Sequence, residues 1–149
     1  MNAMKLRPNN DVLYSAKWNE VYTLTNHWKS EMDFYADELR FLKNLTGRYF
    51  IWLNKDENIA RINLLLTDLK KLSELRGVLS ECIHDHLKHI AALIENAFVY
   101  DEHTFKDEHA KLEYEMTIFI QKFKLLKKKV FDFTENILGD EKLESTVYR

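Results

Sequence analysis

Apolar residues recur along this chain at intervals of three, four and seven positions, and they form three long stripes. The first stripe extends to about Leu53, the second from Ile62 to about Phe98, and the third from Phe105 to Ile137. Such spacing places apolar side chains on one face of an α-helix. We therefore expect three helices of about 35 to 43 residues, each roughly 50 to 60 Å long at 1.5 Å per residue.

The first and third stripes are close to a heptad repeat. The first passes through Val21, Leu24, Trp28, Tyr35, Leu42, Leu45, Tyr49 and Trp52. The third repeats at strict sevens through Phe105, Leu112, Phe119, Leu126 and Phe133. A sevenfold repeat is typical of helices that pack along a common seam, as in coiled coils. We expect these side chains to be buried.

Polar or helix-breaking residues separate the stripes. Pro8 and the asparagines after it indicate an irregular lead-in, so residues 1–10 are expected to lie outside the first helix. The segments 54–56 and 100–102 are polar and short enough to be turns. Gly139 fits a helix stop, which leaves 140–149 as an irregular polar tail.

Short links between long helices favour antiparallel neighbours. The expected fold class is therefore all-α, an up-down-up bundle of three long helices in a single domain over residues 1–149. Gly47 and Gly77 fall inside the first two predicted helices. A break at either glycine would give a four-helix bundle instead, which is the alternative.

Composition supports a helical protein. Three glycines and one proline are too few for the turns of a β-sandwich or a doubly wound sheet. The single Cys82 excludes an internal disulfide and fits a reducing compartment, so we expect a cytoplasmic protein. A net charge of −2 gives no general attraction to nucleic acid or anionic lipid, and no apolar run reaches the roughly 18 residues of a membrane span. We expect neither partner.

The stretch ECIHDHLKHI, residues 81–90, holds three of the six histidines. Antiparallel pairing places all six in the part of the bundle away from the first turn. Glu81 and His84 form the only Glu-x-x-His pair and point outward, so a di-iron bundle with two inward pairs is not supported. A looser metal site remains, whose candidate ligands are His27, Glu31, His86, His89, His109 and Glu113.

The residue types of this looser site are similar to those of hemerythrin-type sites, in which histidines and carboxylates from several bundle helices bind two irons. The resemblance covers a handful of positions. It implies a metal-binding bundle with iron or another transition metal as the alternative function. If the protein does not bind a metal, we expect no cofactor, and the histidines are then half-buried or solvated side chains.

Charged residues also occupy the predicted seam. Glu31 and Glu38 replace apolar residues in the first helix, and Arg76 does so in the second. Arg76 is expected level with residue 35, between the two glutamates, so we predict an ion-paired layer that fixes the register of the helices. The lysines at 127–129 are expected on a solvated face.

The apolar arcs of the first two helices are wider than the roughly 100° that a three-helix bundle needs. The surplus residues are Phe34, Phe41, Phe50, Trp52, Leu75 and Val78. Surplus apolar surface usually marks a contact with another chain. No catalytic constellation accompanies it, so we expect no enzyme but an interaction or scaffold protein. It would act through self-association, as a homodimer, or through a partner helix.

Overall fold

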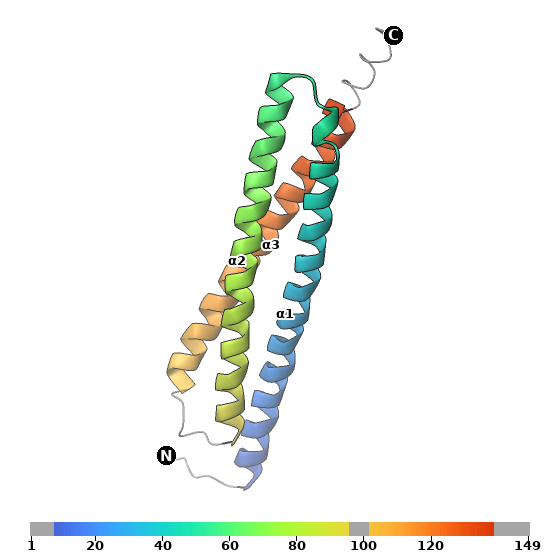
Figure 1. Ribbon diagram of the computed structural model, residues 1–149. Coiled ribbons are helices and arrows are strands. Elements are labelled where there is room, and N and C mark those ends of the chain that lie inside the picture. The colour runs from blue at the N-terminus through green and yellow to red at the C-terminus, as the bar shows by residue number, and fades with distance from the viewer. Residues whose placement is uncertain (1–7, 96–101, 139–149) are drawn as a thin grey trace. The chain divides into compact units, whose positions relative to one another are not determined.

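The computed structural model describes residues 8–95 and 102–138. It describes the side chains of residues 17–95 and 102–136. Three long α-helices make up most of it: α1 (Pro8–Arg48), α2 (Asp56–Glu95) and α3 (Glu102–Asp132). They pack against one another, and the described ranges contain no strand (Figure 1). The prediction of an all-α bundle of three helices is confirmed.

The first helix ends earlier than its apolar stripe predicts. α1 stops at Arg48, directly after Gly47, and the chain continues as a 3₁₀ turn, η1 (Phe50–Trp52). The Trp52 N–H donates to the Tyr49 carbonyl over 3.0 Å, which tightens this turn. The expected helix end at Leu53 is therefore wrong, because residues 50–52 form this 3₁₀ turn and do not continue the α-helix.

Gly77 does not interrupt the second helix. α2 runs without a break through Gly77, so the four-helix alternative is not found in the described ranges. A Cβ added at Gly77 would meet no atom within 4 Å, which means that no close contact requires a glycine there.

The other helix ends differ from the sequence expectations by small amounts. α1 begins at Pro8 rather than after residue 10, in agreement with the preference of proline for the first turn of a helix. α3 is followed by a π-helical turn, η2 (Phe133–Leu138). The other expected tail residues, 1–7 and 140–149, and most of the second predicted turn lie outside the described residues.

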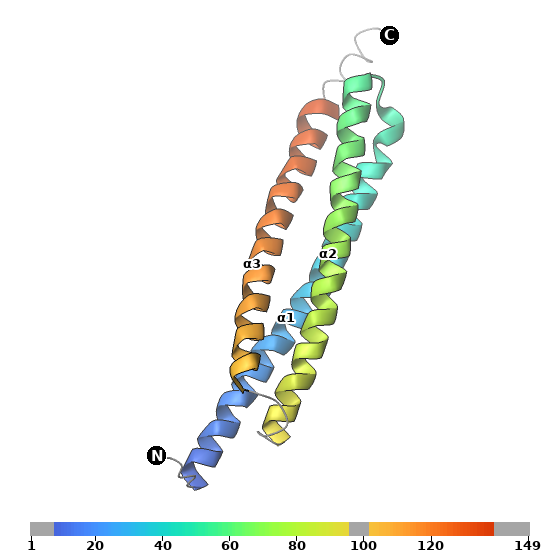
Figure 2. The same cartoon turned by 90° about the vertical axis from the view of Figure 1, so that its left-hand side faces the viewer.

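The chain divides into two compact units. The first unit comprises Met1–Asp33 and Leu79–Glu115, and the second comprises Phe34–Val78 and Met116–Arg149. Within each unit, a segment of α2 runs antiparallel to segments of α1 and α3 (Figure 1 and Figure 2). The single domain over residues 1–149 stays a prediction.

Aromatic rings anchor the interior of the first unit. Trp18 and Phe105 pack edge to face with ring centroids 5.0 Å apart. Ile90 and Leu93 of α2 complete this buried cluster. The cluster joins all three helices, so it holds the histidine-bearing part of α2 in a fixed position against α3.

The second unit has its own aromatic centre. Tyr35 of α1 meets Phe119 and Phe123 of α3 edge to face, at centroid distances of 5.3 and 4.8 Å. Aliphatic residues of α2, among them Leu69 and Leu72, are buried in the same unit.

Burial follows the third stripe throughout and the first stripe only in part. All five residues of the strict sevenfold repeat in α3 and η2 are buried, as predicted. In α1, Leu24 is 44 % exposed and its neighbour Thr25 is buried. The buried positions of this part of α1 include Trp18, Thr25 and Met32, which are seven residues apart, and Leu24 lies one position before that set. Trp52 is 66 % exposed because the chain has left the α-helix before it.

Candidate functional site

His86 lies on the inner face of α2 in the first unit. It is placed there by the helical period that also buries Ile83, Leu87 and Ile90, and only 3 % of its surface is exposed. Its imidazole stacks on the Phe105 ring at a centroid distance of 4.3 Å and an angle of 6°. The inward orientation that the sequence predicts for His86 is confirmed.

A second imidazole from α3 reaches His86. The two nitrogens His86 Nε2 and His109 Nδ1 are 2.9 Å apart and share a hydrogen bond. The His109 ring also stacks against Trp28 of α1, with centroids 4.9 Å apart. Three helices therefore fix a stack of rings that passes from Trp28 through His109 and His86 to Phe105.

Burial keeps both imidazoles neutral. Loss of solvent and the neighbouring His109 together lower the pKa of His86 to about 4, while Glu108 opposes the change. Burial also lowers the pKa of His109, against the influence of Glu113. Neutral imidazole carries a lone pair on one nitrogen, which is the form that binds metal ions.

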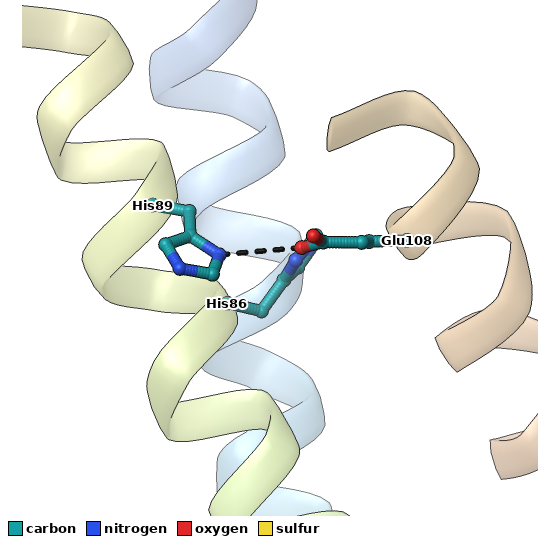
Figure 3. Close-up of side chains that lie close together, drawn as sticks. All are labelled: His86, His89 and Glu108. Atoms are coloured by element: carbon teal, nitrogen blue, oxygen red, sulfur yellow. Dashed lines mark ion pairs between the residues drawn. The ribbon is translucent and has the colours of Figure 1, made fainter. Parts of the chain in front are cut away.

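A carboxylate from α3 completes a small cluster. His89 Nδ1 lies 3.3 Å from Glu108 Oε1, and both side chains are partly exposed. Potential ligand atoms of His86, His89 and Glu108 all lie within 4.8 Å of one another (Figure 3). The figure shows the two histidines side by side on α2, with the Glu108 carboxylate reaching toward them.

The cluster opens into a cleft of ≈ 230 Å³ between α2 and α3. Cys82, Asp85 and Glu115 line the same cleft. Burial raises the pKa of the Cys82 thiol, and the Glu115 and Asp85 carboxylates raise it further. The thiol is therefore protonated, while the carboxylates give the cleft a negative character.

The predicted metal ligands divide into two groups. His86, His89 and His109 come together as described. His27 pairs with Glu31 at 3.8 Å on the surface of α1, where the His27 side chain is 69 % exposed. His27 therefore lies apart from the cluster of His86, His89 and Glu108, because the inward position of that turn of α1 belongs to Trp28.

The outcome for α3 concerns one predicted ligand and one residue that was not predicted. Glu113 is exposed and lies outside the cluster of His86, His89 and Glu108. Sequence reasoning missed Glu108, which directly precedes His109. The signal for it was its place one turn after Phe105, which puts Glu108 beside the same helix interface.

All six histidines fall in the first unit, as antiparallel pairing predicts. Glu81 and His84 are both exposed, so their outward orientation is confirmed.

The seam charges lie partly where they were expected. In the second unit, Lys127 Nζ donates to Glu38 Oε1 over 3.2 Å. Lys127 was expected on a solvated face, and its half-buried pairing with Glu38 corrects that expectation. Arg76 is half-buried in the same unit, and its ion-paired layer with Glu31 and Glu38 stays a prediction.

The predicted interaction surface lies in the second unit. Phe34, Phe41, Trp52 and Val78 are each more than half exposed, and Phe50 is 38 % exposed. The sixth residue of the set, Leu75, is half-buried and lines a groove between α2 and α3.

This groove consists of two adjoining hollows of ≈ 280 and ≈ 410 Å³, which share Asp68 and Lys129. Its apolar lining is Leu64, Leu65, Leu72, Leu75, Leu125, Leu126 and Phe133. Its charged lining is Arg61, Lys71, Lys122 and Lys129 against Asp68 and Asp132. We call it the α2–α3 groove.

Comparison with known proteins gives no relative from which a function could be transferred. No family model, no curated protein and no solved structure matches the chain. Among the described helices, none is both long enough and apolar enough to cross a membrane.

Proposed function

We propose that this protein is a non-enzymatic interaction protein whose α2–α3 groove binds an amphipathic helix of a partner protein. The observation that carries the proposal is the exposure of large aliphatic side chains along a groove with a positively charged rim. Leu64 is 66 % exposed and Leu125 is 63 % exposed, and both line the groove.

The apolar positions of α2 follow the repeat that a helical partner requires. Leu64 and Leu75 are eleven residues apart, which places them on one side of α2, and both line the groove. Leu125 lies opposite on α3. A helix laid between α2 and α3 would cover these side chains with its own apolar face, in the manner of helix-in-groove recognition.

The charges select the kind of helix. Arg61, Lys71, Lys122 and Lys129 outnumber Asp68 and Asp132 along the groove. A partner with glutamates or aspartates beside its apolar stripe complements this rim, whereas a basic helix is repelled. The rim thus supports an acidic amphipathic helix as the occupant.

Burial of the two leucines provides much of the affinity. Each exposed leucine contributes about 1 to 2 kcal/mol when a partner covers it. Removal of both should therefore weaken binding at least about tenfold, since 1.4 kcal/mol corresponds to a factor of ten.

A synthetic amphipathic helix tests the proposal by fluorescence anisotropy. The probe carries leucines at helical spacing and glutamates beside them, and a second peptide replaces the glutamates by lysines. We expect the acidic peptide to bind more tightly, with an affinity that falls as salt rises. The double variant Leu64→Gln/Leu125→Gln should lose this binding.

Phe41→Gln is the matched control, because Phe41 is 54 % exposed and does not line the groove. It should change the affinity by less than about twofold. Equal losses in Phe41→Gln and in the double variant, or equal binding of the two peptides, would overturn the proposal.

Light scattering on the same protein tests whether a second copy of the chain occupies the groove. The wild type could prove to be a stable homodimer that Leu64→Gln/Leu125→Gln dissociates and that the acidic peptide does not disrupt. This result would place a second copy of the chain in the groove. The partner helix would then be wrong. The free thiol of Cys82 supports a reducing compartment, the cytoplasm, as the place of this interaction.

A further inference from the structure

The histidine cluster of the first unit does not line the α2–α3 groove. It contains a buried imidazole, a second imidazole one turn further along α2, and a carboxylate from α3. Two nitrogen donors and one carboxylate form the ligand set of many protein sites for zinc and ferrous iron.

We propose that His86, His89 and Glu108 bind one divalent transition-metal ion of the zinc and ferrous-iron class, and that His109 positions His86 for this task. The ion would join α2 to α3 within the first unit. This inference is independent of the α2–α3 groove, whose lining residues all belong to the second unit.

The distances suit such an ion after a small adjustment. Bonds of 2.0 to 2.2 Å from a tetrahedral metal place its ligand atoms about 3.3 to 3.6 Å apart. His89 Nδ1 and Glu108 Oε1 already have this separation, at 3.3 Å. The ligand atoms of all three residues lie within 4.8 Å of one another. Side-chain rotations that move these atoms by roughly 1 Å would bring all three to the separation that the metal requires.

The hydrogen bond to His109 fixes the imidazole of His86. When His86 Nε2–H donates to His109 Nδ1, its Nδ1 keeps the lone pair that binds the metal. Ligand histidines usually donate their other N–H in this way, and that donor bond orients the ring. Stacking on Phe105 and Trp28 restricts both rings further.

The surroundings favour a cation and provide access. Asp85 and Glu115 line the cleft on which the cluster opens, against the single positive charge of Lys111. Three protein ligands leave a fourth position for water from the cleft. The protonated Cys82 thiol is not among the three.

Calorimetric titration of Zn²⁺ into the full-length, untagged and metal-stripped protein tests the site. We expect one Zn²⁺ per chain and a rise of the melting temperature, because the ion binds the folded state. His89→Gln and Glu108→Gln remove half-exposed ligands without opening the core. Each should weaken binding by at least roughly tenfold, since even outer-shell partners are worth that much.

His84→Gln is the matched control, because His84 lies on the same helix but faces solvent. It should keep the wild-type affinity within about twofold. Circular dichroism must show that every variant keeps its helices. No Zn²⁺ binding, or equal losses in His84→Gln and His89→Gln, would contradict the proposal and indicate adventitious binding to surface histidines.

Co²⁺ as the probe tests the positioning role of His109. We expect the visible bands of four- or five-coordinate Co²⁺ in the wild type. His109→Leu should alter these bands and weaken binding about tenfold. His109→Asn should restore them, because its amide oxygen can accept the His86 N–H. A spectrum unchanged in His109→Leu would show that His109 does not position the ligand.

Discussion

The two units are built from the same three helices, yet their interiors and surfaces differ. The first unit contains all six histidines, and His86 is buried among aromatic rings. Of the eleven large apolar side chains that are exposed among the described residues, three lie in the first unit, namely Tyr22, Leu24 and Tyr114, and eight lie in the second. The second unit surrounds its centre of Tyr35, Phe119 and Phe123 with apolar neighbours.

This difference teaches that one helical repeat can support two kinds of chemistry. A polar donor in the interior of the first unit is held by stacking and a hydrogen bond, next to the proposed metal ligands. In the second unit the surplus apolar residues lie on the surface, where the proposed partner helix would cover some of them. Changes in one unit should therefore affect different properties from changes in the other.

The largest effect should come from the aromatic centre of the second unit. Phe119→Ala removes a fully buried ring, which should lower the free energy of unfolding by about 3 to 5 kcal/mol. Phe34→Ala is the control, because Phe34 is 56 % exposed and should cost less than about 1 kcal/mol. Urea denaturation measures both, and equal losses would show that Phe119 does not lie in a packed interior.

Acid should weaken the first unit through His86. The pKa of His86 is about 4 in the folded protein, against about 6.5 in an unfolded chain. The unfolded state thus takes up the proton first, so this stabilisation is complete above pH 6.5 and is lost as the pH falls toward 4. The loss should approach roughly 1.4 kcal/mol per pH unit in the metal-free protein.

His86→Leu removes this proton-linked loss, and the groups that face His86, namely His89, Glu108 and His109, remain in place. The variant should therefore show a flatter dependence of unfolding free energy on pH between 6.5 and 4. His103→Gln is the control, because His103 is 82 % exposed and should keep the wild-type slope. Identical slopes in His86→Leu and wild type would argue against a neutral buried imidazole.

A smaller gain is expected at Gly77, just before the boundary between the units. Gly77→Ala adds a Cβ that meets no atom within 4 Å inside α2. It should raise the free energy of unfolding by up to about 1 kcal/mol, because alanine is the better helix former. A loss of stability measured by thermal denaturation would show that the glycine serves a bend or a contact.

The smallest effect should come from the ion pair of Glu38 with Lys127. Both side chains are partly exposed, so the pair should contribute about 0.2 to 1 kcal/mol. A double-mutant cycle with Glu38→Gln and Lys127→Met measures this coupling. A coupling above about 2 kcal/mol would mean that the pair is part of a buried network such as the predicted layer with Arg76.

Much of the fold could be predicted from the apolar pattern, because burial in long helices follows the helical period. The five positions of the third stripe and the inward orientation of His86 follow from spacing alone. The end of α1 could not be placed in this way. There the apolar stripe continues to Trp52 although the chain changes from the α-helix to a 3₁₀ turn, and spacing contains no information on that change.

The candidate site was less accessible to sequence reasoning. Helix levels bring His86 and His109 to the same region, but they do not show that the rings share a hydrogen bond. Glu108 was missed although the stripe through Phe105 places it beside the helix interface, because spacing does not show which acid of α3 reaches the histidines of α2. Leu24 was misplaced because the sevenfold set that α1 buries contains two threonines, Thr25 and Thr46, which an apolar pattern does not count.

The central claim is that the two units bind different ligands, and amide ¹H–¹⁵N spectra test it on one sample. Addition of one equivalent of Zn²⁺ should shift the signals around His86, His89 and Glu108, and leave those of Leu64 and Leu125 in place. The acidic helical peptide should then do the reverse. Shifts of the same set of residues by both ligands, or no shift by either, would contradict the account.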